Sequence, residues 1–188
     1  FELGNAELEQ AADFDAAVAA WADSLRYSAK HLPEIVQRCV PRLSPEEFDQ
    51  RLLPEQAATL VKAADAWIDA GYPDAAPAVL QRAGRAVDKE LSVADARQRA
   101  GLFQLAARVQ GRLENFHEAA NFQRKAVRTD PLKVSLRIVL VEYLLQAERI
   151  TEANSELKLI ERLEPNNSRA ANLRQRIFDL QNPRLKLD

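Results

Sequence analysis

The strongest constraint on the fold is an internal repeat in the C-terminal half of the chain. Residues 114–131 align without a gap with residues 148–165. The aligned residues share their chemical character at these positions: Phe116 with Ile150, Glu118 with Glu152, Ala119 with Ala153, Ala126 with Ile160, Asp130 with Glu164, and Pro131 with Pro165. The period is 34 residues, and a period of roughly 20 to 50 residues indicates an array of small structural units stacked on one another.

The composition of the chain favours helices. Ala, Leu, Arg, Glu and Gln dominate the sequence, and only 5 glycines and 9 prolines interrupt it. The dominant residues have the highest intrinsic preference for the α-helix. With 47% hydrophobic and 29% charged residues, the chain has enough apolar surface to fold and is not a disordered tail. We therefore predict an all-α fold.

The order of large and small residues within the repeat resembles the tetratricopeptide repeat (TPR) family. In that family the first helix carries a large residue, a Leu-and-small pair and an aromatic residue, and the second carries Ala, a large residue and a final Pro. One repeat offers Phe103, Ala106-Ala107, Gln110, Ala119, Gln123, Ala126 and Pro131. The next offers Arg137, Leu140-Val141, Leu144, Ala153, Leu157, Ile160 and Pro165. The resemblance implies an all-α, right-handed superhelical solenoid of antiparallel helix pairs.

Three polar residues depart from the family's pattern. Gln110, Gln123 and Arg137 stand where the family has apolar residues. Phe122 and Leu136 each lie one position away from a departure. We expect these two side chains to supply the missing packing.

The pattern divides the chain into segments of a single helical repeat domain, residues 1–188. We predict a truncated repeat at 1–28, a degenerate helical segment at 29–54, a loose repeat at 56–88 with its turn at Gly71, regular repeats at 100–133 and 134–167, and a capping helix at 168–182. Ala76 lies 43 residues before Ala119, nine more than one period, so the helices between them must be extended or bent. The chain starts at Phe1, inside a repeat, and contains no Met, which indicates a processed form or a piece of a longer protein.

The proline-rich segment 29–54 is interpreted as a degenerate repeat and not as a linker. Two short helices fit it, one from Pro33 to about Val40 and one from Ser44 to about Leu52. Ser44 and Glu47 have the spacing of a capping box at the start of the second helix. The order SLRYSAKHLPEIV (24–36), LSPEEF (43–48) and LLP (52–54) resembles soluble tails of bacterial polysaccharide ligase and polymerase-type membrane proteins.

Charge is distributed unevenly along the chain, although the net charge is only −2. Residues 1–94 carry 9 Lys and Arg against 16 Asp and Glu, and residues 95–188 carry 17 against 12. Solvated helix surfaces that happen to differ would explain this. The alternative is a basic C-terminal face that receives an acidic partner segment or the acidic half of another copy, so a homo-oligomer is left open.

Composition and spacing argue against several other classes of protein. An isoelectric point near 5.8 and the lack of aromatic residues among the arginines argue against nucleic-acid binding, and an RNA-binding helical repeat is kept as a minor alternative. No apolar run reaches the ~18 residues that span a bilayer. The single cysteine, Cys39, is compatible with a cytoplasmic or a periplasmic location, so the compartment is left open.

The sequence offers little for catalysis. The candidates for proton transfer or metal binding are His31 and His117. His31 precedes Cys39 by eight residues, but no positioning Asn or Asp motif and no oxyanion turn accompanies them. No phosphate loop, His-Glu-x-x-His helix or calcium loop is present. We therefore predict no enzymatic activity, no catalytic residues, no cofactor and no metal site.

Binding of a protein or peptide is the better class of function. An array of helix pairs presents a concave groove lined by the first helix of each pair. The resemblance places these residues in the groove: Gln104, Arg108, Arg112, Ile138, Glu142, Leu145, Arg169, Asn172 and Arg176. The alternative for several of them is a solvated position or one covered by neighbouring helices. We predict a protein-protein interaction or scaffolding module with Arg108 and Arg112 as electrostatic anchors and Ile138 and Leu145 as apolar contacts. A regulatory or assembly domain of a larger bacterial membrane enzyme for cell-surface polysaccharide is the alternative.

Overall fold

The structure is a computed structural model that describes residues 1–6 and 13–182. Within these ranges the chain forms α-helices joined by short turns, and no strand is present. The all-α prediction is confirmed. The chain divides into two compact units, unit 1 from Phe1 to Ser92 and unit 2 from Val93 onward. The division falls within the stretch between Ala76 and Ala119 where the repeat spacing has its nine-residue excess.

Unit 1 holds the less regular helices. They are α1 (Glu2–Ala6), α2 (Phe14–Tyr27), α3 (Leu32–Cys39), α4 (Pro45–Leu52), α5 (Ala57–Asp69), the short 3-10 helix η2 (Pro73–Ala75) and α6 (Ala76–Val93). Part of the truncated repeat, residues 7–12, lies outside the described residues. Helix α6 spans 18 residues without interruption, and it lies in the stretch that has the excess spacing.

Helix α4 starts where the sequence predicted. The Ser44 hydroxyl accepts a hydrogen bond from the Glu47 amide at 3.2 Å, and the Glu47 carboxylate accepts one from the Ser44 amide at 2.8 Å. This capping box satisfies two amides that have no partner within the helix. Hydrogen bonding of the Glu47 carboxylate to the backbone of Ser44, then to its side chain, and the charge of Arg51 lower the pKa of Glu47.

One arginine on α6 fixes the irregular segment that follows α4. Arg82 donates to the carbonyl oxygens of Asp49 at 3.1 Å and Leu53 at 2.9 Å, and its Nε lies 2.6 Å from the Glu55 carboxylate. Arg82 also pairs with the Asp49 carboxylate. The core of unit 1 includes Trp67. Its ring packs edge-on against the ring of Phe48, with the two ring centroids 5.2 Å apart.

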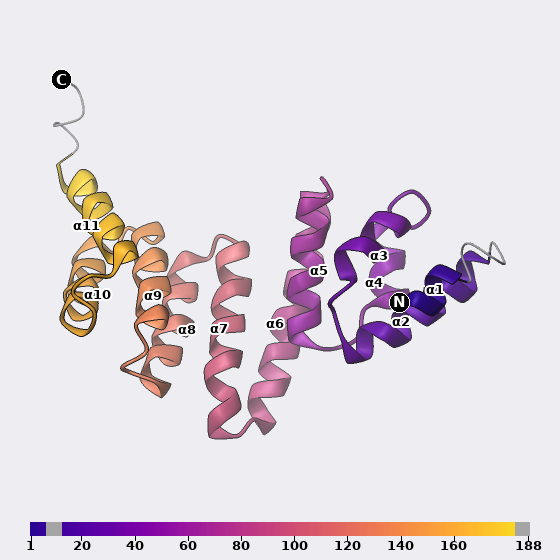
Figure 1. Ribbon diagram of the computed structural model, residues 1–188, viewed down its shortest axis with the longest axis horizontal. Coiled ribbons are helices and arrows are strands. Elements are labelled where there is room, and N and C mark those ends of the chain that lie inside the picture. Colours follow the sequence, from indigo (N-terminus) through magenta and orange to yellow (C-terminus); the bar gives the residue numbers. More distant parts are fainter. Residues whose placement is uncertain (7–12, 183–188) are drawn as a thin grey trace. The chain divides into compact units, whose positions relative to one another are not determined.

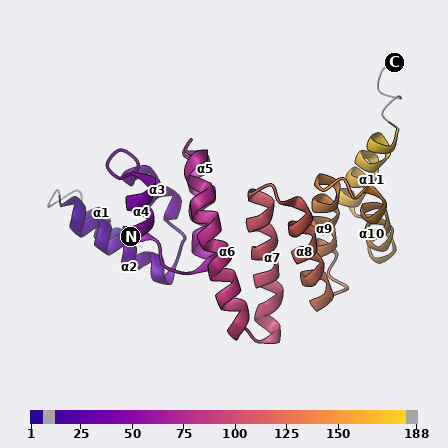
Figure 2. The same cartoon turned by 180° about the vertical axis from the view of Figure 1, so that it is seen from behind.

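Unit 2 contains the regular helix pairs. Its helices are α7 (Ala96–Arg112), α8 (Phe116–Thr129), α9 (Val134–Gln146), α10 (Ile150–Leu163) and α11 (Ser168–Gln181). Figures 1 and 2 show that they alternate in direction, each beside the one before it. Asn167 caps the last of them, because its side chain accepts a hydrogen bond from the Ala170 amide at 3.0 Å.

The turn inside each helix pair has the same backbone geometry three times. Gly71, Glu114 and Glu148 each follow a first helix with a positive φ, of 88°, 60° and 58°. In each turn the backbone amide of the next residue donates a hydrogen bond to the carbonyl oxygen five positions earlier, at 2.8–2.9 Å. This bond satisfies one of the carbonyls at the end of the helix. Glu114 and Glu148 are 34 residues apart, so the sequence period is also a backbone period.

The core of unit 2 explains the three departures from the family's pattern. Gln123 is 1% exposed, and its amide donates to the Leu136 carbonyl at 2.8 Å. The guanidinium of Arg137 lies 2.5 Å from the Glu156 carboxylate, and Gln110 accepts a hydrogen bond from Asn115 at 3.0 Å. Each polar residue therefore has a polar partner. The expectation that Leu136 supplies packing is met, since it is 3% exposed and lies in the core cluster.

Candidate functional site

A pocket of about 640 Å³ lies between α7, α8 and α9 within unit 2. We call it the α7–α9 pocket. The residues that line it are Gly101, Gln104, Leu105, Arg108, Arg112, Gln123, Val139 and Tyr143. Three of the predicted groove residues, Gln104, Arg108 and Arg112, are therefore gathered around one cavity.

The period of the α-helix brings these three side chains together. Gln104, Arg108 and Arg112 are four residues apart along α7, and residues at this spacing lie on the same face of a helix. All three are exposed. The pocket therefore has a rim with two guanidinium groups and a side-chain amide.

Tyr143 is one of five lining residues that were not predicted as groove residues; the others are Gly101, Leu105, Gln123 and Val139. A Cβ added to Gly111 would lie 2.6 Å from Cε1 and 3.0 Å from the hydroxyl of Tyr143, so the ring rests directly against the backbone of α7. The pKa of Tyr143 is raised, mainly because the side chain is largely buried. The charge of Glu142 also raises this pKa, whereas the charges of Arg108 and Arg112 lower it. The signal in the sequence was Gly111, because a glycine inside a helical pattern lowers helix stability relative to alanine and is compatible with the close approach of a neighbouring side chain.

Two further predicted residues form an ion pair. Arg169 at the start of α11 donates to the Glu142 carboxylate on α9 at 2.8 Å. Asn172 and Arg176 are exposed on α11. Neither is among the residues that line the α7–α9 pocket.

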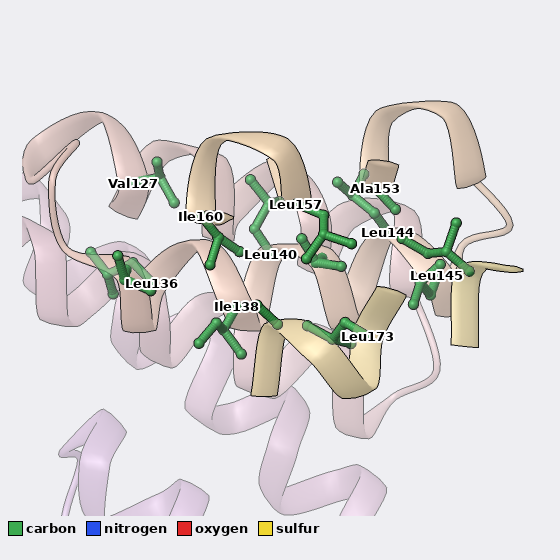
Figure 3. Close-up of a cluster of buried hydrophobic side chains, with 14 of the residues drawn as sticks. Val127, Leu136, Ile138, Leu140, Leu144, Leu145, Ala153, Leu157, Ile160 and Leu173 are labelled. Carbon is green, nitrogen blue, oxygen red and sulfur yellow. The ribbon is translucent and has the colours of Figure 1, made fainter. Parts of the chain in front are cut away.

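The expectation that Ile138 and Leu145 offer exposed apolar contacts is wrong. They are 3% and 5% exposed and belong to the core cluster together with Leu173 of α11, as Figure 3 shows. Helix α11 packs on α9, and α9 is apolar on nearly all sides. A helix that is apolar on nearly all sides is usually buried. The apolar sequence of α9 therefore already indicated that Ile138 and Leu145 are covered.

The candidate catalytic residues are poorly placed for chemistry. Cys39 is fully buried, and burial raises the pKa of its thiol to about 12 against the lowering charges of Arg51 and Arg42. The His31 ring stacks on Phe1 with their centroids 4.1 Å apart. Since the thiolate is the nucleophilic form, a thiol this well protected is unsuited to catalysis.

Residues 1–6 and 13–182 offer neither a metal-binding cluster nor a membrane-spanning helix. No group of three or more His, Cys, Asp or Glu side chains in these ranges could hold a metal ion. Nor does any helix there have both the length and the apolar character needed to cross a membrane.

The chain is similar to known proteins in structure but not in sequence. No protein-family model matches the chain, and no curated protein matches it at a significant level. A chain of the APC/C hetero-tetramer Cut9–Hcn1 aligns with 90% of this chain at a TM-score of 0.51 and 12% identity, and 34% of that chain is covered. This chain thus spans about a third of its length. YrrB, a TPR protein with an unusual peptide-binding site, aligns with 98% of this chain and 95% of its own at a TM-score of 0.49 and 15% identity.

The likeness to the Cut9–Hcn1 chain concerns the fold alone, because the sequence identity is low. Two observations from this chain add to it. The helices follow one another in antiparallel pairs, and the turns at Glu114 and Glu148 repeat at 34 residues. The fold is TPR-like.

Proposed function

We propose that this chain is a protein-interaction module that binds an extended, acidic segment of a partner protein in the α7–α9 pocket. The observation that carries the proposal is the composition of the pocket. Arg108 and Arg112 stand on its rim, and within the described part of the chain no Asp or Glu lines it. A positively charged concave surface attracts carboxylates and raises their local concentration.

The side chains of the pocket suit such a ligand. A guanidinium presents a planar fork that pairs with a carboxylate through two hydrogen bonds. The hydroxyl of Tyr143 can donate to a carboxylate or a peptide carbonyl, and Leu105 and Val139 offer apolar surface. The ligand would therefore carry acidic side chains together with apolar ones.

The neighbouring polar residues limit where the ligand is held. The ion pair between Glu142 and Arg169 neutralises the charge beside α11. We place the electrostatic anchor at Arg108 and Arg112, and Asn172 and Arg176 would contact only a ligand long enough to reach α11. TPR-like folds commonly serve in protein interactions, which supports this class of function.

The test is a titration with a fluorescent peptide of about twelve residues in which glutamate and leucine alternate. Charge reversal at Arg108 and Arg112 (Arg108→Glu with Arg112→Glu) should weaken binding by about tenfold or more, since reversed contacts repel the ligand. Binding to the native chain should also weaken as salt is added.

The matched control reverses two exposed cations on α10, Lys158→Glu with Arg162→Glu, which changes the net charge equally and leaves the pocket intact. This control should retain most of the affinity. If both double variants lose affinity to the same degree, the peptide follows the overall charge of the chain and the proposed pocket is wrong.

A further inference from the structure

A second basic groove lies on the same helix pair, outside the α7–α9 pocket. It has a volume of about 440 Å³ and lies between the start of α7 and the end of α8. We call it the α7–α8 groove. Its lining residues are Ala96, Arg99, Phe103, Lys125, Arg128 and Thr129.

The groove and the pocket lie on opposite faces of α7. Arg99 precedes Arg108 by nine positions, and Phe103 precedes Arg112 by nine. Nine residues make about two and a half turns of an α-helix. A ligand held by Arg108 and Arg112 therefore leaves the α7–α8 groove open.

The cations of the groove differ from their neighbours in how they are neutralised. In the described part of the chain, no carboxylate forms an ion pair with Arg99, Lys125 or Arg128. The adjacent Arg124, by contrast, pairs with Glu152 at 2.6 Å. Among the residues that the structure describes, positive charge therefore remains without an ion-pair partner around this groove.

Lys125 of the groove contacts two aromatic rings, Phe103 in the groove lining and Phe122, which is not part of that lining. The Lys125 ammonium lies 4.7 Å from the ring centroid of Phe122 and 5.8 Å from that of Phe103. A nucleic-acid base needs a free aromatic face on which to stack. The contacts of Lys125 therefore argue against RNA as the ligand and leave the groove suited to carboxylates with an apolar neighbour.

We propose that the α7–α8 groove is a second docking site, separate from the α7–α9 pocket, for an acidic protein segment that carries a bulky apolar side chain. Arg99 and Arg128 pair with its carboxylates, and the apolar side chain contacts Ala96 and the edge of the half-buried Phe103, whose ring face is occupied by Lys125. Charge complementarity selects this ligand, because the lining has three cations and no anion. The proposal does not depend on the α7–α9 pocket being occupied.

The experiment uses the peptide of alternating glutamate and leucine and measures stoichiometry by calorimetry. The native chain should bind two peptides. Lys125→Ala with Arg128→Ala should remove one binding event and leave the one that depends on Arg108 and Arg112. Ala96→Trp fills the groove and keeps its charges. This variant should weaken the binding event at the α7–α8 groove at least fivefold.

The controls separate this site from general attraction and from the pocket. Lys158→Ala with Arg162→Ala removes the same charge from α10 and should keep both events. Arg108→Ala with Arg112→Ala should remove only the binding event at the α7–α9 pocket. If the native chain binds a single peptide and that binding depends on Lys125 and Arg128, the groove proposal is supported even though the pocket proposal is wrong. Far-UV circular dichroism checks that each variant keeps its helices.

Three results would overturn the proposal. The first is a groove double variant that binds as the native chain does. The second is tighter binding of a single-stranded RNA oligonucleotide than of the peptide, lost with the same variant. The third is self-association of the native chain in sedimentation that the groove variant abolishes, because the occupant would then be a second copy.

Discussion

The left-handed turn residues give a prediction that tests the repeat geometry directly. Glu114 and Glu148 have φ values of 60° and 58°, a region in which the Cβ of an L-residue is close to the following carbonyl oxygen. We predict that Glu148→Gly stabilises unit 2, and that Glu114→Gly does the same. Gly71, at the equivalent turn of unit 1, has a φ of 88°, and Gly71→Ala should destabilise unit 1.

The magnitude follows from two opposing terms. The left-handed conformation costs an L-residue ~1–2 kcal/mol, and this cost disappears on substitution with Gly. Glycine loses ~0.5–1 kcal/mol more backbone entropy on folding. The net stabilisation is therefore about 0.5–1 kcal/mol for each Glu→Gly variant, and Gly71→Ala should cost a similar amount. A Cβ on Gly71 would meet nothing within 4 Å, so crowding adds nothing to that cost.

Urea unfolding measures these changes with a probe suited to each unit. Both tryptophans, Trp21 and Trp67, lie in unit 1, so their fluorescence follows Gly71→Ala. Circular dichroism follows the variants of unit 2. The control is Glu148→Ala, which keeps a Cβ and should leave stability nearly unchanged. If Glu148→Gly is no more stable than Glu148→Ala, the backbone argument is refuted.

Three further predictions concern the pocket, the core and the buried thiol. Gly111→Ala should displace the Tyr143 ring, because the new Cβ would lie 2.6 Å from Cε1, and weaken binding of the glutamate-leucine peptide several-fold while the helix content is unchanged. Glu156→Ala leaves Arg137, whose side chain is 13% exposed, without its carboxylate partner. The free energy of unfolding in urea should fall by ~1–3 kcal/mol, and Arg137→Leu with Glu156→Leu should recover most of that loss. The pKa of Cys39 is raised from 9.0 to about 12, so the unfolded chain loses this proton first and the free energy of unfolding should fall as the pH rises from 9 towards 12. At pH 8 the thiol should react with Ellman's reagent only after unfolding.

The sequence predicted well those features that depend on neighbouring residues. Ser44 and Glu47 are three positions apart, and their capping box forms between groups of the same turn. Arg108 and Arg112 share a face because the period of the helix places them there. The 34-residue spacing and the all-α class follow from the same local regularities.

Contacts between helices were the features that the sequence did not reveal. Gln123 and Arg137 read as departures from the repeat, and only the structure shows the Leu136 carbonyl and Glu156 that satisfy them. Such partners come from other helices, so no spacing along the chain indicates them.

The sequence alone determined the class of fold, the period and the starts of several helices, because backbone geometry and capping act over a few residues. The tertiary structure decided which side chains are available to a partner. It covers Ile138 and Leu145 with the core around α11, sets Tyr143 against Gly111, and leaves Arg99 and Arg128 around a groove. The physical reason is that exposure depends on which helices pack together, and side-chain packing settles that across distances in the sequence that no local pattern spans.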